Sequence, residues 1–133
     1  MNLEKISFNT FGGVFFSGIS YFLGGLDSAI ITLLIVMSID YLTGVCKALY
    51  NKKINSKVGL KGIIKKVGYL LIVALAVKLD QIAGQTGAIR TLVIYFFVAN
   101  EGISILENWG NMGLPLPKKL MGTLEQLKKE NDK

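Results

Sequence analysis

Apolar residues gather in four long stretches along the chain, separated by short polar segments. The stretches cover residues 8–25, 28–50, 67–83 and 88–106. None of them shows the wide polar stripe that a helix presents to water, which indicates helices that face lipid on most sides. A helix of about 20 residues crosses the hydrocarbon layer of a bilayer. The last three stretches therefore predict membrane-spanning helices.

The first stretch, residues 8–25, is short and rich in glycine, so it either spans the bilayer or lies in its interface. The expected fold is therefore all-α, a polytopic membrane protein with three to four transmembrane helices. The alternative is a soluble α protein with buried core helices, but a soluble chain of 133 residues needs more polar surface than a 51% apolar one offers. The N-terminus combines Glu4 and Lys5 with no small-residue cleavage site, so it is expected to be retained.

The composition changes after residue 106. Pro115 and Pro117 favour extended backbone, and leucines then recur at spacings of three and four. This pattern predicts a short amphipathic helix that ends in a charged run. We expect a transmembrane helical domain over residues 1–110 and a cytoplasmic tail over residues 111–133. The leucines are Leu116, Leu120, Leu124 and Leu127.

Lysines between the second and third stretches set the predicted orientation. Residues 47–66 contain no acid, and the positive-inside rule places this basic loop at the inner leaflet, in the cytoplasm. Two spans separate the loop from the C-terminus, which is then cytoplasmic too. We expect Gly59 and Gly62 to break the loop into pieces that either lie at the headgroups or form a solvated connector. Its lysines are Lys47, Lys52, Lys53, Lys57, Lys61, Lys65 and Lys66.

The residue types exclude several kinds of chemistry. Cys46 is the only cysteine, so the chain forms no internal disulfide. The chain has no histidine, which excludes a histidine metal site and a Ser-His-Asp triad. Of its 15 basic residues only Arg90 is an arginine, a bias that argues against nucleic-acid binding. No metal or cofactor is expected.

Ionisable residues inside the apolar stretches are costly and need a partner or water. Asp40 lies deep in the second stretch and shares a helix face with Thr43 and Lys47. Glu101 lies at a similar depth in the fourth stretch, close to one face with Arg90, Ser104 and Asn108. Two carboxylates at one level repel, so we expect compensation by a proton, by Lys47 or by a neighbouring subunit.

A second polar group, Lys78, Asp80 and Arg90, is expected near the outer surface. The polar faces either line a functional interface or an aqueous path, or they act as static polar contacts that hold helices together. We favour a functional interface because ionisable residues inside membrane spans are energetically costly and usually have a functional role.

Six short motifs follow one another along the chain, and together they resemble the phage holin family that also includes clostridial toxin-secretion holins. The resemblance extends from about residue 24 to residue 127. In order, the motifs are DYLTG (40–44), SKVGLKGIIKK (56–66), Lys78-Leu79-Asp80, Arg90, NEGISILEN (100–108) and GLPLP (113–117).

The resemblance implies a multi-pass protein of the bacterial cytoplasmic membrane that oligomerises and is not an enzyme. It would open lesions that release endolysin, or in some relatives a large toxin, as cargo without stable binding. An antiholin is a further candidate partner. The lysines would sit at the anionic inner leaflet. One helix face would be organised by Asp40, Tyr41, Thr43 and Gly44, and another by Glu101, Ser104, Glu107 and Asn108.

Two other functions remain open from the residues alone. A small proton-coupled transporter or channel subunit would use Asp40 or Glu101 to exchange protons for a cation. An antiholin, or a membrane adaptor with a partner on its C-terminal helix, would regulate or organise rather than open the membrane.

Overall fold

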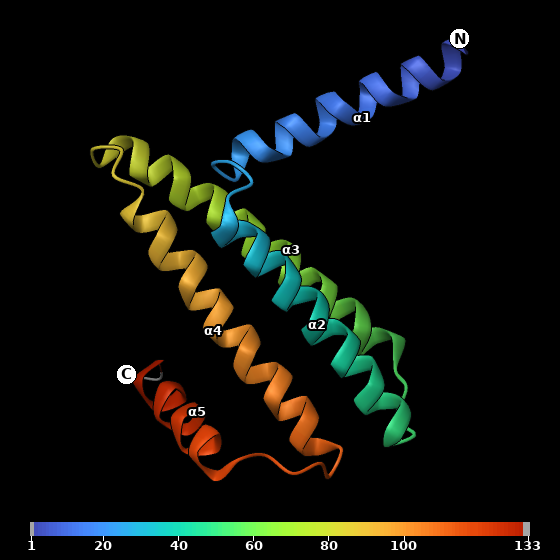
Figure 1. Cartoon of the computed structure of the whole chain (residues 1–133), viewed down its shortest axis with the longest axis vertical. Coiled ribbons are helices and arrows are strands. Elements are labelled where there is room, and N and C mark those ends of the chain that lie inside the picture. The colour runs from blue at the N-terminus through green and yellow to red at the C-terminus, as the bar shows by residue number, and fades with distance from the viewer. Residues whose placement is uncertain (1, 132–133) are drawn as a thin grey trace.

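The computed structural model describes residues 2–131, and this part of the chain is helical with no strand, which confirms the all-α prediction. Helix α4 packs against both α2 and α3, whereas α2 and α3 touch each other least. The three form an elongated bundle, from which α1 projects at one end and beside which α5 returns at the other (Figure 1). The helices are α1 (Leu3–Phe22), α2 (Ser28–Tyr50), α3 (Ser56–Ile82), α4 (Ala88–Asn111) and α5 (Lys118–Asn131).

Side-chain caps fix where the bundle helices begin. Asp27 accepts a hydrogen bond from the Ile30 N–H at 3.1 Å at the start of α2. Asn55 accepts one from the Lys57 N–H at 2.9 Å at the start of α3. A helix leaves its first N–H groups without internal partners, so such acceptors stabilise the first turn. The sequence positions of Asp27 and Asn55 therefore separate α2 and α3 from the turns before them.

One helix, α3, replaces the broken basic loop expected from the sequence. It continues without interruption through Gly59 and Gly62, so the expectation that these glycines break the segment was wrong. Each glycine costs a helix only about 1 kcal/mol, and the lysines and leucine around them favour helix. The segment expected as a basic loop, residues 47–66, is therefore the end of α2, a turn over residues 51–55 and the first turns of α3.

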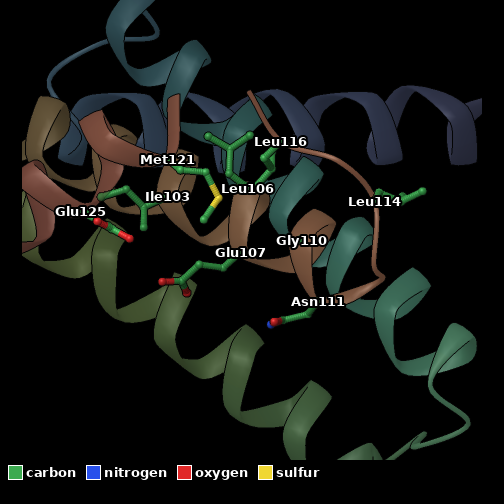
Figure 2. A pocket seen from close by; sticks show the side chains of 9 residues that line it. All are labelled: Ile103, Leu106, Glu107, Gly110, Asn111, Leu114, Leu116, Met121 and Glu125. Atoms are coloured by element: carbon green, nitrogen blue, oxygen red, sulfur yellow. The ribbon is translucent and has the colours of Figure 1, made fainter. Parts of the chain in front are cut away.

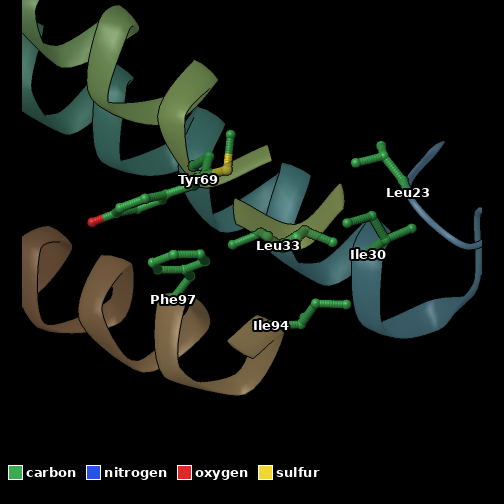
Figure 3. Packing of buried hydrophobic residues seen from close by; sticks show 8 residues of the cluster. Leu23, Ile30, Leu33, Tyr69, Ile94 and Phe97 are labelled. Atoms are coloured by element: carbon green, nitrogen blue, oxygen red, sulfur yellow. The ribbon is translucent and has the colours of Figure 1, made fainter. Parts of the chain in front are cut away.

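The bundle has a narrow apolar core. Ile30 and Leu33 from α2, Val73 from α3 and Ile94 from α4 are each fully buried (Figure 3). Beside them the ring of Tyr69 stacks on that of Phe97, with centroids 4.0 Å apart. Close packing of this kind holds helices together in lipid as well as in water, because it depends on contacts between side chains.

The outward surface of the bundle is also apolar. Leu71 of α3 and Leu92 of α4 are 66% and 72% exposed. Helices α2 and α4 are long and apolar enough to cross a membrane. A surface of this kind suits contact with lipid, since a soluble domain rarely exposes so many large apolar side chains together.

Helices α1 and α5 lie outside the core. Helix α1 contributes no buried residue to the bundle. Helix α5 coincides with the helix expected after the Pro115–Pro117 segment. Two of its leucines, Leu124 and Leu127, have side chains that lie outside the described residues, so its amphipathic character stays a prediction.

Arg90 ties the α1–α2 turn to the start of α4. Its Nε donates to the Leu23 carbonyl at 2.7 Å and its Nη2 to the Gly25 carbonyl at 3.1 Å. Gly24 has a φ of +79°, and a Cβ added there would lie 2.7 Å from the Arg90 Nε. This close approach is open only to glycine.

The buried core generates a direct test of the bundle. Replacing Ile94→Ala removes a fully buried side chain and should lower the free energy of unfolding by about 2–4 kcal/mol, because a cavity loses its packing contacts. Leu92→Ala, on the exposed face of the same helix, should cost less than about 1 kcal/mol. Denaturant titration in detergent micelles, followed by circular dichroism, measures both. Equal losses for the two variants would mean that Ile94 does not lie in a core.

Candidate functional site

Three charged side chains from three helices meet inside the bundle. Lys66 of α3 lies between Asp40 of α2 and Glu101 of α4. Its Nζ is 2.6 Å from Asp40 Oδ2 and 2.5 Å from Glu101 Oε2. The side chains of Lys66, Asp40 and Glu101 are 11%, 14% and 0% exposed. We call this cluster the charged triad.

The charged triad has one more carboxylate than it has cations. If all three groups are ionised, the cluster carries a net charge of −1 at a largely buried position. The Glu101 Oε1 atom is buried and has no hydrogen-bond partner among the described residues. A buried, unsatisfied polar atom costs about 1–3 kcal/mol, and more when it is charged. The ion pairs therefore hold the triad together, but one carboxylate charge has no matching cation within it.

Polar side chains of α4 extend the triad along α2. Asn108 Nδ2 donates to the Asp40 carbonyl and to Asp40 Oδ1, both at 3.2 Å, and to Thr43 Oγ1 at 3.0 Å. Ser104 lies within hydrogen-bonding reach of the Asp40 carboxylate. A Cβ added at Gly44 would lie 3.7 Å from Asn108 Nδ2, an ordinary contact distance. The two helix faces expected from the sequence therefore meet each other.

Tyr69 and Asn100 border the charged triad, and sequence reasoning assigned neither of them a role. Asn100 Nδ2 donates to the Tyr69 hydroxyl at 2.6 Å, and the Lys65 ammonium lies 5.4 Å from the centre of the Tyr69 ring. Tyr69 follows Lys66 by three positions, so a continuous helix puts both on one face. A prediction of α3 as one continuous helix would therefore have placed Tyr69 beside Lys66.

A second cluster lies at the opposite end of the bundle from the turn that joins α2 and α3. Asp80 accepts hydrogen bonds from the N–H groups of Ile89 at 3.0 Å and Arg90 at 2.8 Å, so it caps α4 from α3. The Arg90 guanidinium pairs with Asp27 at 2.7 and 3.1 Å. The Lys78 side chain instead contacts Gln81 of the same helix, with its Nζ 3.4 Å from Gln81 Oε1. Asp80 and Arg90 thus lie together as expected from the sequence, without Lys78.

Asp27 is the member of this cluster that the sequence analysis missed. The hydrogen bond from Arg90 lowers the pKa of the Asp27 carboxyl below its ordinary value, against the opposing effect of burial. Asp27 therefore stays ionised at neutral pH and remains paired with the guanidinium. Its 63-residue separation from Arg90 leaves no local spacing from which the pair could be inferred.

The remaining sequence-predicted residues lie away from the charged triad. The cation that pairs with both carboxylates is Lys66 of the basic segment, which was not among the expected compensations by a proton, by Lys47 or by a neighbouring subunit. The hydroxyl of Tyr41 faces Gly59 of α3, 3.6 Å from where a Cβ would lie there. Glu107 is exposed and lines a pocket between α4 and α5. Exposed side chains belong to Lys52, Lys53, Lys57, Lys61 and Lys65.

The site is a cluster of ionised and hydrogen-bonding side chains. Residues 2–131 contain no group of three or more cysteines and carboxylates arranged to hold a metal ion. The triad can hold three helices in one register, and it can take up or release a proton. A buried ion pair is strongly destabilising to break and adds little when intact, so it favours one arrangement over others rather than raising stability outright.

Comparison with known proteins identifies the family. Residues 17–129 match the sequence profile of the bacteriophage holin family. The chain is 45% identical over 109 residues to an uncharacterised 14.9 kDa protein from the nagH 3′ region of Clostridium perfringens, covering 81% of this chain and 83% of that one. No solved structure matches the chain.

A phage protein is among the relatives. The chain is 32% identical over 100 residues to a protein of Bacillus phage phi105 named "Probable holin", covering 75% of this chain and 74% of the phage protein. The profile match covers most of the chain, and the apolar outer faces of the bundle agree with a membrane protein. The chain belongs to the bacteriophage holin family, and with it to the proteins of the membrane.

Proposed function

We propose that this chain is a holin that oligomerises in the bacterial cytoplasmic membrane and forms lesions that release an endolysin or a large toxin. The observation that carries the proposal is the charged triad inside a bundle whose outer faces are apolar. Charges facing lipid would be expelled or neutralised, whereas charges packed between helices can be stored there and exposed later.

The proposed topology has three or four spans. Helices α2 and α4 cross the membrane, and α3 crosses between them because it is antiparallel to both and packs against α4. Its charged residues lie at the triad and near its two ends, where lysines reach the headgroups. Helix α1 either adds a fourth span or lies in the interface. The basic turn between α2 and α3, the end of α4 and helix α5 are then all cytoplasmic.

The charged triad gives the closed bundle a defined way to open. In the closed state Lys66 pairs with both carboxylates, and the polar side chains of α2 and α4 face each other. If the helices separate within an assembly, the same groups can face water, where hydration replaces the ion pairs. Because a buried ion pair gains little over hydrated charges, the two states can lie close in free energy. Small changes in packing can then select one of them.

This role requires no enzymatic activity and no stable complex with cargo. Endolysin or toxin would pass through the lesion without recognition by the chain. Partners would be the lipid bilayer, further copies of the chain and, as a regulator, an antiholin.

Expression in a bacterium with and without a cytoplasmic endolysin tests the proposed function. We expect rapid lysis only when both proteins are present, because the endolysin reaches the wall through the lesion. Culture density and the release of a cytoplasmic reporter enzyme measure this outcome. Proton-coupled uptake of small cations into proteoliposomes, without release of the reporter, would instead indicate a transporter. Absence of lysis together with delay of a second holin would indicate an antiholin.

Replacing Lys66→Met tests the role of the charged triad. The substitution leaves two carboxylates buried without their cation. Removal of one partner from a buried ion pair typically lowers stability by about 3–5 kcal/mol. We expect the closed state to be weakened and lysis to begin earlier at equal membrane abundance. Lys65→Met removes a charge from the adjacent, exposed position and should leave the timing unchanged. Lysis time and immunoblots of the membrane fraction give the measurement.

The neutral triple variant Asp40→Asn, Lys66→Met and Glu101→Gln separates charge from packing. It removes the ion pairs while keeping side chains of similar size, so the closed bundle should persist and lysis should be delayed. A triple variant and a Lys66→Met variant that both lyse cells on the normal schedule would show that the triad does not control opening.

A further inference from the structure

A pocket lies at the end of the bundle where α4 ends, and none of the triad residues lines it. It has a volume of about 500 Å³ and lies between the end of α4, the segment before α5 and α5 itself. Leu106, Leu116 and Met121 supply apolar walls, and the carboxyl groups of Glu107 and Glu125 lie at one edge (Figure 2). An apolar pocket with an acidic edge suits an apolar side chain flanked by cations.

The same end of the molecule carries a protrusion of complementary character. The basic turn, defined as residues 51–57, exposes 72% of Ile54 at its centre. Lys52, Lys53 and Lys57 surround this isoleucine, and all three are exposed. Exposure of a large aliphatic side chain to water is unfavourable, and here that side chain lies among three lysines. It is therefore a candidate anchor for a partner surface.

The pocket and the basic turn lie at one level, on different sides of the end of α4. Asn51 Nδ2 is 3.5 Å from the Asn111 carbonyl, so the turn and the end of α4 share one end of the molecule. Helix α5 lies on one side of α4, whereas the α2–α3 turn lies on the other (Figure 1). A chain therefore does not fill its own pocket with its own turn, but a neighbour in the same membrane orientation can.

We propose that the basic turn of one copy docks into the α4–α5 pocket of the next copy, with Ile54 as the apolar anchor and Glu125 facing the lysines. The inference rests on the proposed self-association of the holin and names the surfaces that carry it. Because the two surfaces differ, the contact is head-to-tail, and a pair of copies still has one free turn and one free pocket for further copies. Repetition of such a contact in the plane of a membrane builds rings or open rows rather than closed dimers.

Disulfide crosslinking in native membranes tests this contact. In a Cys46→Ser background, Ile54→Cys combined with Met121→Cys should give a ladder of dimers, trimers and larger species on mild oxidation. The matched control combines Ile54→Cys with Thr123→Cys, on the same helix but not among the pocket-lining residues. It should give at least several-fold less product. Ile54→Cys alone should give little dimer, since two turns do not meet.

Charge exchange supplies a second readout in the same crosslinking pair. Lys53→Glu should lower the yield of the ladder several-fold, and adding Glu125→Lys should restore it. Lys61→Glu, the same change on an exposed part of α3, should leave the yield unaltered. Restoration by the exchanged pair distinguishes contact between these two surfaces from a general dependence on charge.

Three outcomes overturn the docking proposal. They are a crosslink yield no higher than that of the Thr123 control, efficient dimerisation through Ile54→Cys alone, and failure of the exchanged charges to restore the ladder. Lysis by the same variants without oxidant reports separately on the proposed function. Normal lysis without a ladder would leave the holin assignment standing and assign the pocket to another occupant, such as a lipid chain.

Discussion

The arrangement of the three bundle helices relative to one another depends on a lysine held between two carboxylates. Lys66 is the point where α2, α3 and α4 are joined by charge, and its two partners come from the helices on either side. In lipid, apolar surfaces give little preference for one helix arrangement over another, because the tails are as apolar as the side chains. The ion pairs supply the preference, since any rotation or sliding that separates them leaves a charge buried without a partner.

The rest of the structure arranges itself around this constraint. Asn108, Ser104 and Thr43 continue the polar contact between α2 and α4, and the stacked rings of Tyr69 and Phe97 are part of the apolar core. At the other end, Arg90 and Asp80 tie the starts of α2 and α4 and the end of α3 to one another. The bundle has polar contacts inside and apolar side chains outside. If its helices separate, the inner polar side chains need water around them. That property agrees with the proposed role in opening a membrane.

The sequence predicted helix α2 with the bounds that the structure has, and it identified Asp40 and Glu101 as charges at similar depth. The length of an apolar stretch and the position of a carboxylate within it are both visible in the sequence, so these features could be predicted from it. The partner of these carboxylates could not be read in this way. Lys66 ends a run of lysines that resembles a surface segment, and only a continuous α3 turns it inward. The pairing of Asp27 with Arg90 depends on how three helices pack, which no spacing along the chain encodes.

The central claim is that the charged triad is dry in the closed bundle and meets water when the membrane opens. Ser104, partly buried and beside Asp40, reports on this directly as Ser104→Cys in a Cys46→Ser background. Labelling with a membrane-impermeant thiol reagent should be slow before the onset of lysis and rapid after it. Equal labelling before and after onset, in a variant that still lyses cells, would contradict the account.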